Sequence, residues 1–193
     1  MRNQHHAKMG GFSMTEALVA VAILSFGLLG VLGLQTAALK FTRDARLQAV
    51  AVGFGRELGE MMRANARLAA QAHNPYLGAF SGDALAPQTA ASGCLDSGQS
   101  CASPADVARA QMADWLARVD SALPGARVTV CADSSPYDAH GLPVWDCAAP
   151  PAAEPGAMYI KIGWTREDTR GATVAASHPA ARPFVVLPVA LHS

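Results

Sequence analysis

The segment KMGGFSMTEALVAVAILSFGLLGVLGL, from Lys8 to Leu34, decides how this chain is organised. Between Ala17 and Leu34 it holds no charged residue, and Ser25 is its only conventional polar side chain. A helix of about 18 residues is roughly 27 Å long, close to the thickness of the hydrocarbon core of a bilayer. Such a helix satisfies its own backbone hydrogen bonds in lipid, so residues 12–34 are predicted to span a membrane.

Basic residues on one side of this segment predict its orientation. Arg2 and Lys8 precede it, and a short basic end tends to stay in the cytoplasm while the larger part of the chain crosses. A cleaved secretory signal is a weaker interpretation, because the apolar core is long and continues into further helical sequence.

Glu16 is the feature that a plain membrane anchor leaves unexplained. A charged acid costs about 2.5–3.5 kcal/mol at the centre of a membrane helix and less near the interface, so it usually has a partner. One interpretation is that Thr15 and Glu16 begin a helix, where the macrodipole favours a carboxylate. That interpretation gives no reason for Gly10-Gly11-Phe12 directly before them.

The hexapeptide GFSMTE, Gly11–Glu16, resembles the processing site of type IV prepilins and pseudopilins. The resemblance implies that a prepilin peptidase removes residues 1–11 as a leader and N-methylates the new terminus at Phe12. A glycine before the cut leaves room for close approach of the backbone. Glu16 is then the fifth mature residue. The resemblance implies that it pairs with the terminal amine of a neighbouring subunit and sets the register of a filament, where an unpaired buried charge is costly.

After Lys40 the apolar residues recur at helical spacing, with charged residues between them. The apolar positions are Leu47, Val50, Phe54, Leu58, Met61 and Met62, and the polar ones are Arg43, Arg46, Arg56, Glu57, Glu60 and Arg63. One helix over about residues 12–72 is predicted, with residues 35–73 as its amphipathic half. It is expected to stop at HNPY, where Pro75 makes continuation difficult.

Three glycines, Gly27, Gly30 and Gly33, lie inside the apolar run. Each weakens a helix by roughly 0.5–1 kcal/mol relative to alanine. Two explanations stay open at this point. The glycines let helices pack closely in a membrane, or they form a soft segment that stretches when a subunit leaves lipid for a fibre, as the resemblance to pilin helices suggests.

Residues 74–193 are predicted to form a small α+β cap. The Gly-, Ser- and Ala-rich stretch that begins at Gly78 is expected to be a surface loop. Ser103 is a suitable N-cap for a helix that ends at Pro124-Gly125. Three strands are expected, at residues 127–131, 158–168 and 184–191; the second is half-buried, and Pro188 marks the third as an edge strand or a bulge.

The four cysteines, Cys94, Cys101, Cys131 and Cys147, all follow the apolar segment, and none forms a CxxC pair. An even number behind an export-like N-terminus indicates two disulfides in an oxidising compartment such as a periplasm. Three pairings are possible. We choose the two local ones, Cys94–Cys101 and Cys131–Cys147, each worth roughly 2.5–3 kcal/mol in the chain-entropy model.

The downstream half is similar to the PilV-type minor pilins, or type IV pilus modification proteins. The similar features are a cysteine-bearing loop, a helix with Trp115-Leu116, a Leu123-Pro124-Gly125 turn and a strand ending in Trp164-Thr165. Major pilins commonly close a disulfide loop near the C-terminus, whereas no cysteine follows Cys147 here, and this favours a minor pilin. The implied fold is α+β, with a long N-terminal helix packed on a small antiparallel sheet and a second helix.

The resemblance implies a minor pilin that takes part in assembly or initiation of a type IV pilus, and so in motility or adhesion. The implied partners are the prepilin peptidase, other minor pilins, the major pilin, the inner-membrane assembly platform and membrane lipid. The chain is expected in the inner membrane, with its C-terminal part periplasmic, and then at the pilus surface. The alternative is a minor pseudopilin of a type II secretion system. A membrane-anchored enzyme and a tip adhesin are rivals from other classes.

Composition and motifs argue against catalysis and nucleic-acid binding. The chain has 15 basic and 15 acidic residues, so no overall field attracts nucleic acid. It has no GxSxG, P-loop, HExxH or EF-hand motif. Asp133, Asp138, His140 and Asp146 share one loop in which a cation is conceivable, but loop acids are usually solvated. We therefore predict no enzyme activity, no cofactor and no metal site.

Overall fold

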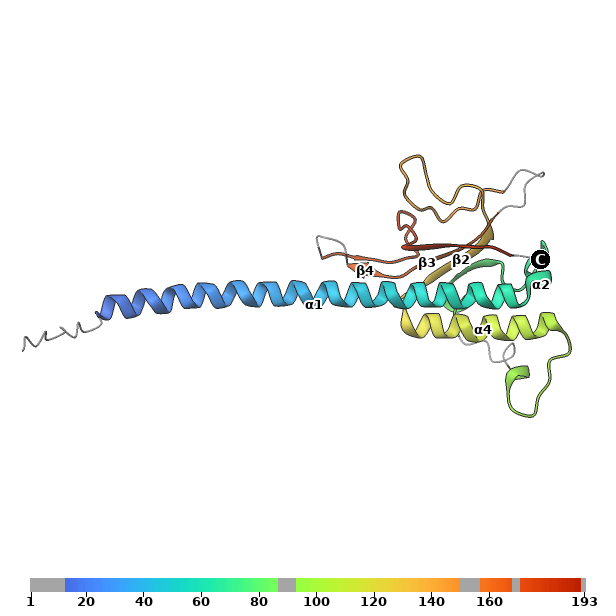
Figure 1. Cartoon of the computed structure of the whole chain (residues 1–193), viewed down its shortest axis with the longest axis horizontal. Helices are drawn as coiled ribbons and strands as arrows, with labels where there is room; N and C mark the ends of the chain where they lie inside the picture. Colours follow the sequence, from blue (N-terminus) through green and yellow to red (C-terminus); the bar gives the residue numbers. More distant parts are fainter. Residues whose placement is uncertain (1–12, 87–92, 150–156, 168–170, 192–193) are drawn as a thin grey trace, which may run out of the picture. The chain divides into compact units, whose positions relative to one another are not determined.

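The computed structural model describes residues 13–86, 93–149, 157–167 and 171–191. The chain divides into two compact units, Met1–Ala45 and Arg46–Ser193. Helix α1 (Met14–Ala64) begins in the first unit and ends in the second. The second unit also holds the helices α2 (Ala66–Ala69) and α4 (Pro104–Ala122), the 3-10 turns η1 (Gly82–Ala84) and η2 (Gly93–Leu95), and the strands β1 (Gly78–Ser81), β2 (Arg127–Ala132), β3 (Met158–Gly163), β4 (Arg166–Glu167), β5 (Thr173–Val174) and β6 (Val185–Val189) (Figure 1).

Four strands form an antiparallel sheet in the order β1-β2-β3-β6. In the central pair, Val128 lies opposite Ile162 and Thr129 lies opposite Lys161. β6 lies at an edge, where Pro188 is tolerated because it has no N–H to give to a further strand. The predicted edge position of this strand is therefore confirmed. β4 and β5 form a separate two-stranded ladder.

The C-terminal half of α1 and the helix α4 pack on one face of the sheet, and α4 runs antiparallel to α1 (Figure 1). The core contains Leu58 and Met62 from α1, Trp115 from α4, and Ile160 and Ile162 from β3. All the apolar positions expected on the amphipathic part of α1 belong to this core or pack against it. The predicted α+β class, with a long helix, a small antiparallel sheet and a second helix, is confirmed.

Two glycines of α1 lie against the sheet, and one of them, Gly55, is needed for the close approach. A β-carbon on Gly55 would collide with Cδ1 of Leu187 on β6, and one on Gly59 would meet Val189 at 3.7 Å. The close contact explains Gly55, a residue that otherwise weakens a helix, whereas the space at Gly59 would admit a β-carbon.

The helix α4 begins and ends as predicted. The Ser103 hydroxyl accepts a hydrogen bond from the backbone N–H of Asp106 at 3.2 Å, and Pro104 is the first helical residue. At the other end, Gly125 has φ of 54°, in the left-handed region that glycine favours.

The first helix ends earlier than the sequence predicted. α1 stops at Ala64, and Asn65 interrupts the helical backbone with φ of −119° before the short helix α2. The Asn65 side-chain amide donates to the carbonyl of Met61 at 3.2 Å and to the hydroxyl of Tyr76 at 2.8 Å. Because Tyr76 is fully buried, these bonds anchor the end of the helix well before Pro75.

Two other expectations were wrong. β1 lies within the stretch expected to be a surface loop, because Phe80 pairs with Val128 and packs against the core. β3 is not half-buried, because Lys161 on its outer face is completely buried. The cover over that outer face is the loop that follows β2, seen above the sheet in Figure 1.

Candidate functional site

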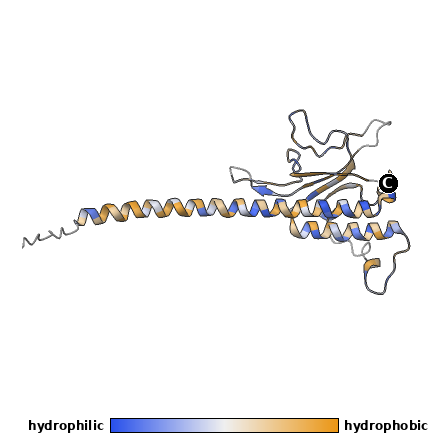
Figure 2. Ribbon diagram, in the orientation of Figure 1, coloured by the Kyte–Doolittle hydropathy of each residue, from blue (hydrophilic) through white to orange (hydrophobic). Residues whose placement is uncertain are grey.

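The N-terminal part of α1 exposes an almost continuous apolar surface. Every residue from Ser13 to Arg46 is exposed, including Leu18, Ile23, Phe26 and Leu32. An 18-residue window of this helix is long and apolar enough to cross a membrane, and none of it is buried. A core helix of a soluble protein would be mostly buried, so the segment is compatible with a single-pass membrane anchor. Figure 2 shows its predominantly hydrophobic colouring.

The hydroxyl groups in this part of α1 bond to the helix itself. Ser25 donates to the carbonyl of Val21 at 2.8 Å, Thr36 to that of Leu32 at 3.1 Å, and Thr42 to that of Ala38 at 2.8 Å. Each bond satisfies a hydroxyl within its own helix. Of the three, only Ser25 lies in the predicted span of residues 12–34, where an unpaired polar group would be costly. The Ser25 hydroxyl is therefore compatible with an apolar membrane anchor.

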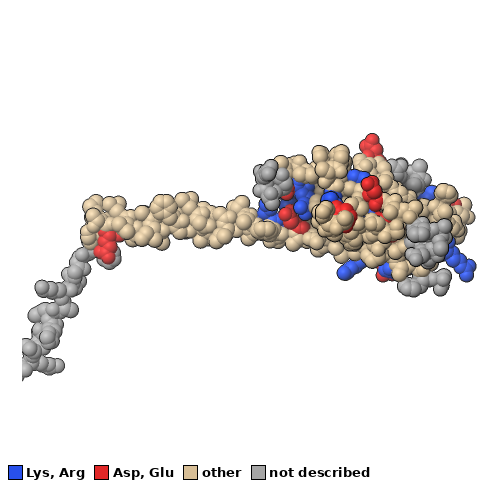
Figure 3. Space-filling model, turned by 90° about the horizontal axis from the view of Figure 1, so that it is seen from above, with Lys and Arg blue, Asp and Glu red and all other residues tan. Residues whose placement is uncertain are grey.

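Glu16 lies in the first turn of α1. Its backbone N–H donates to the carbonyl of Ser13 at 3.0 Å, and the Ser13 and Thr15 hydroxyls are 2.7 Å apart. Within the part of the chain that the structure describes, no side chain forms an ion pair or hydrogen bond with the Glu16 carboxylate. Figure 3 shows acidic atoms close to the beginning of the described helix and no charged atoms along the apolar stretch that follows, on the face in view.

The residues of the predicted processing site are only partly within the described chain. Gly11 and Phe12 lie outside the described residues, as do Arg2 and Lys8 of the leader. Cleavage after Gly11 and methylation of Phe12 therefore remain predictions from sequence.

The glycines of α1 fall into two groups. Gly55 is buried against the sheet, whereas a β-carbon on Gly27, Gly30 or Gly33 would meet nothing within 4 Å. Packing within the described chain therefore gives no reason for the three glycines of the apolar part. Both explanations given for them from sequence remain open.

The cysteines form two disulfides in the second unit, Cys94–Cys101 and Cys131–Cys147, which are the two local pairs chosen from sequence. The first spans 7 positions and lies beside η2 and the start of α4. The second spans 16 positions and joins the end of β2 to the loop that covers the sheet. We call this loop, residues 132–148, the strap.

The strap covers a buried ion pair. The Lys161 ammonium lies 2.6 Å from Oδ2 of Asp133, and both side chains are fully buried. Lys161 also donates to the backbone carbonyl of Asp146 at 2.7 Å. Oδ1 of Asp133 accepts from the backbone N–H of Ser135 at 2.9 Å and of Ala148 at 3.0 Å. Burial raises the pKa of Asp133, but the hydrogen bond from Lys161 and the two backbone N–H groups outweigh it, and the net pKa lies below its usual value.

Trp145 fastens the strap to the outer face of the sheet. Its indole N–H donates to the carbonyl of Ala181 at 2.9 Å. A β-carbon on Gly163 would meet the Trp145 ring at 2.8 Å, so the missing side chain makes room for the ring. The Arg127 guanidinium lies 4.3 Å from the ring centroid. The outer face of the sheet therefore has a small core of its own.

Two of the loop acids considered as cation ligands, Asp133 and Asp138, have other partners. Asp133 faces Lys161, and Asp138 lies 2.8 Å from the Arg182 guanidinium. The pKa of Asp138 is lowered by the backbone N–H of Leu142, with burial opposing, and further by His140 N–H and Arg182. A carboxylate oxygen of Asp133 and the sulfurs of Cys131 and Cys147 lie within 4.8 Å of one another, but the sulfurs are bonded to each other and are not thiolate ligands.

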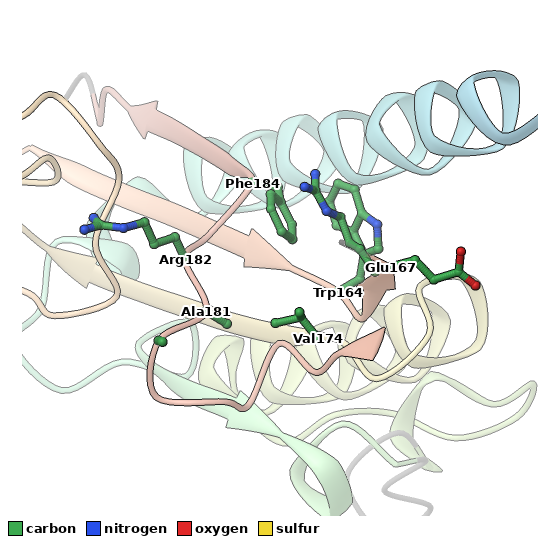
Figure 4. A pocket seen from close by; sticks show the side chains of 8 residues that line it. Trp164, Glu167, Val174, Ala181, Arg182 and Phe184 are labelled. Carbon is green, nitrogen blue, oxygen red and sulfur yellow. The ribbon is translucent and has the colours of Figure 1, made fainter. Parts of the chain in front are cut away.

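A hollow of about 230 Å³ lies beside β4 and β5 (Figure 4). The rings of Trp164 and Phe184 are 5.0 Å apart there, and the Arg166 guanidinium lies 3.8 Å from the Phe184 centroid. The lining residues are aromatic, aliphatic, arginine and glutamate. A hydroxyl, thiol or imidazole is not among them, so this lining offers no nucleophile paired with a base.

Sequence reasoning missed the Lys161–Asp133 pair. The available signal was a single lysine inside the apolar alternation of Met158–Gly163. A buried lysine requires a partner, and Asp133, two residues after a cysteine of the disulfide loop, was a candidate. Comparison with protein-family models, curated proteins and solved structures found no match to this chain.

Proposed function

We propose that this chain is a minor type IV pilin of the PilV type, a structural subunit and not an enzyme. The observation that carries the proposal is the hexapeptide Gly11–Glu16 leading directly into an exposed apolar helix. The cytoplasmic leader is cut after Gly11, and Phe12 becomes the methylated terminus. The mature chain stays in the inner membrane through the N-terminal part of α1, with residues 74–193 on the periplasmic side, until it enters a pilus.

Assembly would depend on Glu16. A carboxylate at the edge of an apolar helix gains most from a cation supplied by another molecule, because its own described chain supplies none. The terminal amine of a neighbouring pilin is such a cation. Pairing at one fixed position along the helix sets the axial register between subunits. The prepilin peptidase, other minor pilins, the major pilin and the assembly platform are the partners in this proposal.

N-terminal sequencing of the protein purified from membranes tests the class directly. We expect a mature chain that starts at methylated Phe12. An intact leader in cells that contain an active prepilin peptidase would overturn the proposal.

Substitution of Glu16 tests the mechanism. Glu16→Gln keeps the shape of the side chain without its charge, and we expect it to abolish incorporation into filaments. Glu16→Asp keeps the charge on a shorter side chain and is expected to retain part of the activity. Normal incorporation of the Gln variant would show that the charge does not set register. Loss of surface pili in a deletion strain supports a pilus subunit, whereas loss of protein secretion would assign the chain to a type II secretion system.

A further inference from the structure

Cys147 is held from both sides by the Lys161–Asp133 pair. The residue before it, Asp146, accepts a hydrogen bond from the Lys161 ammonium through its backbone carbonyl, at 2.7 Å. The residue after it, Ala148, donates its backbone N–H to Oδ1 of Asp133 at 3.0 Å. Asp133 itself lies two residues after Cys131. The Lys161–Asp133 pair therefore hydrogen-bonds to the backbone on each side of Cys147, and Asp133 lies close in sequence to Cys131.

We propose that the buried Lys161–Asp133 pair positions Cys147 against Cys131 and thereby directs the formation of this disulfide. Lys161 and Asp133 are positioning residues and take no part in the electron transfer. Of the three pairings that four cysteines allow, the pair favours the one in which Cys131 meets Cys147. The inference does not depend on the proposed function, because it concerns only how the cap closes.

The chemical step is a thiol–disulfide exchange. Two cysteine thiols of the chain lose two electrons and two protons to an external disulfide, such as oxidised glutathione or an oxidoreductase disulfide, which becomes two thiols. One thiolate of the chain attacks the external disulfide, breaks its S–S bond, forms a mixed disulfide and releases the first external thiol. The second thiolate attacks the chain's cysteine sulfur in the mixed disulfide, forms the Cys131–Cys147 bond and releases the second external thiol. Positioning acts on the second attack, because it raises the effective concentration of one cysteine near the other.

The position of Lys161 sets the order of events. Lys161 is on β3 and lies opposite Thr129 of β2 in the sheet register, and it is 28 positions away from Asp133. The positioning pair therefore exists only after β2 and β3 have joined. Cys131–Cys147 is expected to close after the sheet has formed, whereas Cys94–Cys101 spans 7 positions and closes locally. The Cys94–Cys101 disulfide is thus an internal control in every experiment.

The test measures the equilibrium between each disulfide and a glutathione buffer. The full chain, purified in detergent, is equilibrated over a range of ratios of reduced to oxidised glutathione, alkylated with N-ethylmaleimide and mapped by mass spectrometry. For Lys161→Met we expect the equilibrium constant of Cys131–Cys147 to fall roughly 5- to 150-fold, the usual range for coupling between two sites. The constant of Cys94–Cys101 should not change. An equilibrium constant for Cys131–Cys147 that is the same in Lys161→Met as in the unaltered chain would overturn the proposal.

Asp146→Ala is the matched control. Asp146 is an exposed acid next to Cys147, and Lys161 uses only its backbone carbonyl. Removing this carboxylate should leave both constants unchanged. A fall as large as that of Lys161→Met would show that loop charge in general, and not the buried pair, controls the disulfide.

A double variant separates positioning from stability. Lys161→Met leaves Asp133 as a buried charge without its cation, so it destabilises the fold as a whole. Adding Asp133→Leu removes the second charge, and replacing both partners of a buried pair by apolar residues often restores stability. We expect the melting temperature to recover while the Cys131–Cys147 constant stays low. If the melting temperature and the equilibrium constant of Cys131–Cys147 recover together, the pair acts only through global stability and the proposal is wrong.

A third measurement does not require any change at Lys161. Coupling is reciprocal, so loss of the disulfide must loosen the pair by the same factor. At reagent concentrations where closing of the pair is faster than acetylation, the rate reports the opening equilibrium. In Cys131→Ser/Cys147→Ser the Lys161 amine should then react with an acetylating reagent roughly 5- to 150-fold faster than in the unaltered chain. In Cys94→Ser/Cys101→Ser it should stay protected. If Lys161→Met fails to fold, equal protection of Lys161 in these two double variants would still overturn the proposal.

Discussion

The indole N–H of Trp115 on α4 donates to the backbone carbonyl of Phe54 on α1 at 3.2 Å. The two rings meet edge to face with centroids 6.1 Å apart. Trp115 is fully buried, so this contact carries both packing and a satisfied donor. Beside it, the Arg118 guanidinium contacts the Glu57 carboxylate at 2.5 Å on the exposed side. The junction of the two helices therefore depends mainly on the tryptophan, because exposed ion pairs contribute little.

Trp115→Phe should cost more stability than Trp164→Phe. Both tryptophans are almost completely buried, but the indole N–H of Trp164 has no hydrogen-bond partner among the described residues. Trp115→Phe removes the hydrogen bond to the Phe54 carbonyl, whereas Trp164→Phe removes a donor that has no partner among the described residues. We expect the two losses in free energy of unfolding to differ by about 1–3 kcal/mol. Urea unfolding of both variants in the same detergent measures the difference, and equal losses would contradict the assignment of the bond.

Gly55→Ala and Gly53→Ala should act in opposite directions. A β-carbon on Gly55 collides with Leu187 of β6, whereas one on Gly53, two residues away, meets nothing within 4 Å. Overpacking at Gly55 is expected to cost roughly 1–3 kcal/mol. At Gly53 the higher helix propensity of alanine should stabilise the chain by about 0.5–1 kcal/mol. Thermal unfolding of the two variants measures the difference. A gain at Gly55 as large as that at Gly53 would mean that Leu187 moves aside without cost.

The packed half of α1 and the caps of α4 were predictable because their signals are local. Phe54, Leu58 and Met62 repeat at helical spacing, and Ser103-Pro104 is a common beginning of a helix. The end of α1 was not predictable in the same way. Asn65 stops the helix through a bond to Tyr76, 11 positions further on, and such a contact has no periodicity to detect.

Short strands and the outer face of the sheet were missed for a related reason. β1 has only 4 residues and begins at a glycine, so its strand state comes from pairing with β2 and not from its own propensity. Lys161 looks solvent-facing in an alternating strand. Only the strap, closed by Cys131–Cys147, buries it. Of the predicted assembly and processing residues, Glu16 lies in the described chain, and the role proposed for it involves another subunit.

Acid should unfold the cap through its paired carboxyl groups. The pKa values of Asp133 and Asp138 are both below their usual value of 3.8 in the folded chain. The unfolded state therefore binds more protons, and stability falls as pH decreases. The contribution is fully present above the usual value and is lost as pH falls from about 4 through the lower folded values. The free energy of unfolding, measured from pH 7 to pH 2, should be flat above about pH 5 and then drop.

Asp138→Asn is the variant that checks this cause. The amide oxygen still accepts the N–H groups of His140 and Leu142, which both bond to Oδ1 of Asp138. The fold should therefore survive at pH 7, while the decline in stability below pH 4 becomes shallower because one titrating group is gone. An unchanged acid slope would show that Asp138 carries its usual pKa.

Alanine at Gly27, Gly30 and Gly33 should distinguish the two explanations for these glycines. Since a β-carbon at each position meets nothing within 4 Å, the triple variant should leave the melting temperature of the cap unchanged. Its apolar helix gains roughly 1.5–3 kcal/mol of intrinsic helix stability over three positions. If the glycines soften the helix for a fibre, the variant accumulates in the membrane and enters filaments less. If they serve close packing between membrane helices, crosslinking of the unassembled subunit to its neighbours falls instead. Gly53→Ala stiffens the same helix outside the apolar segment and is the control for helix propensity alone. Normal membrane crosslinking together with normal filament entry by the triple variant would contradict both explanations.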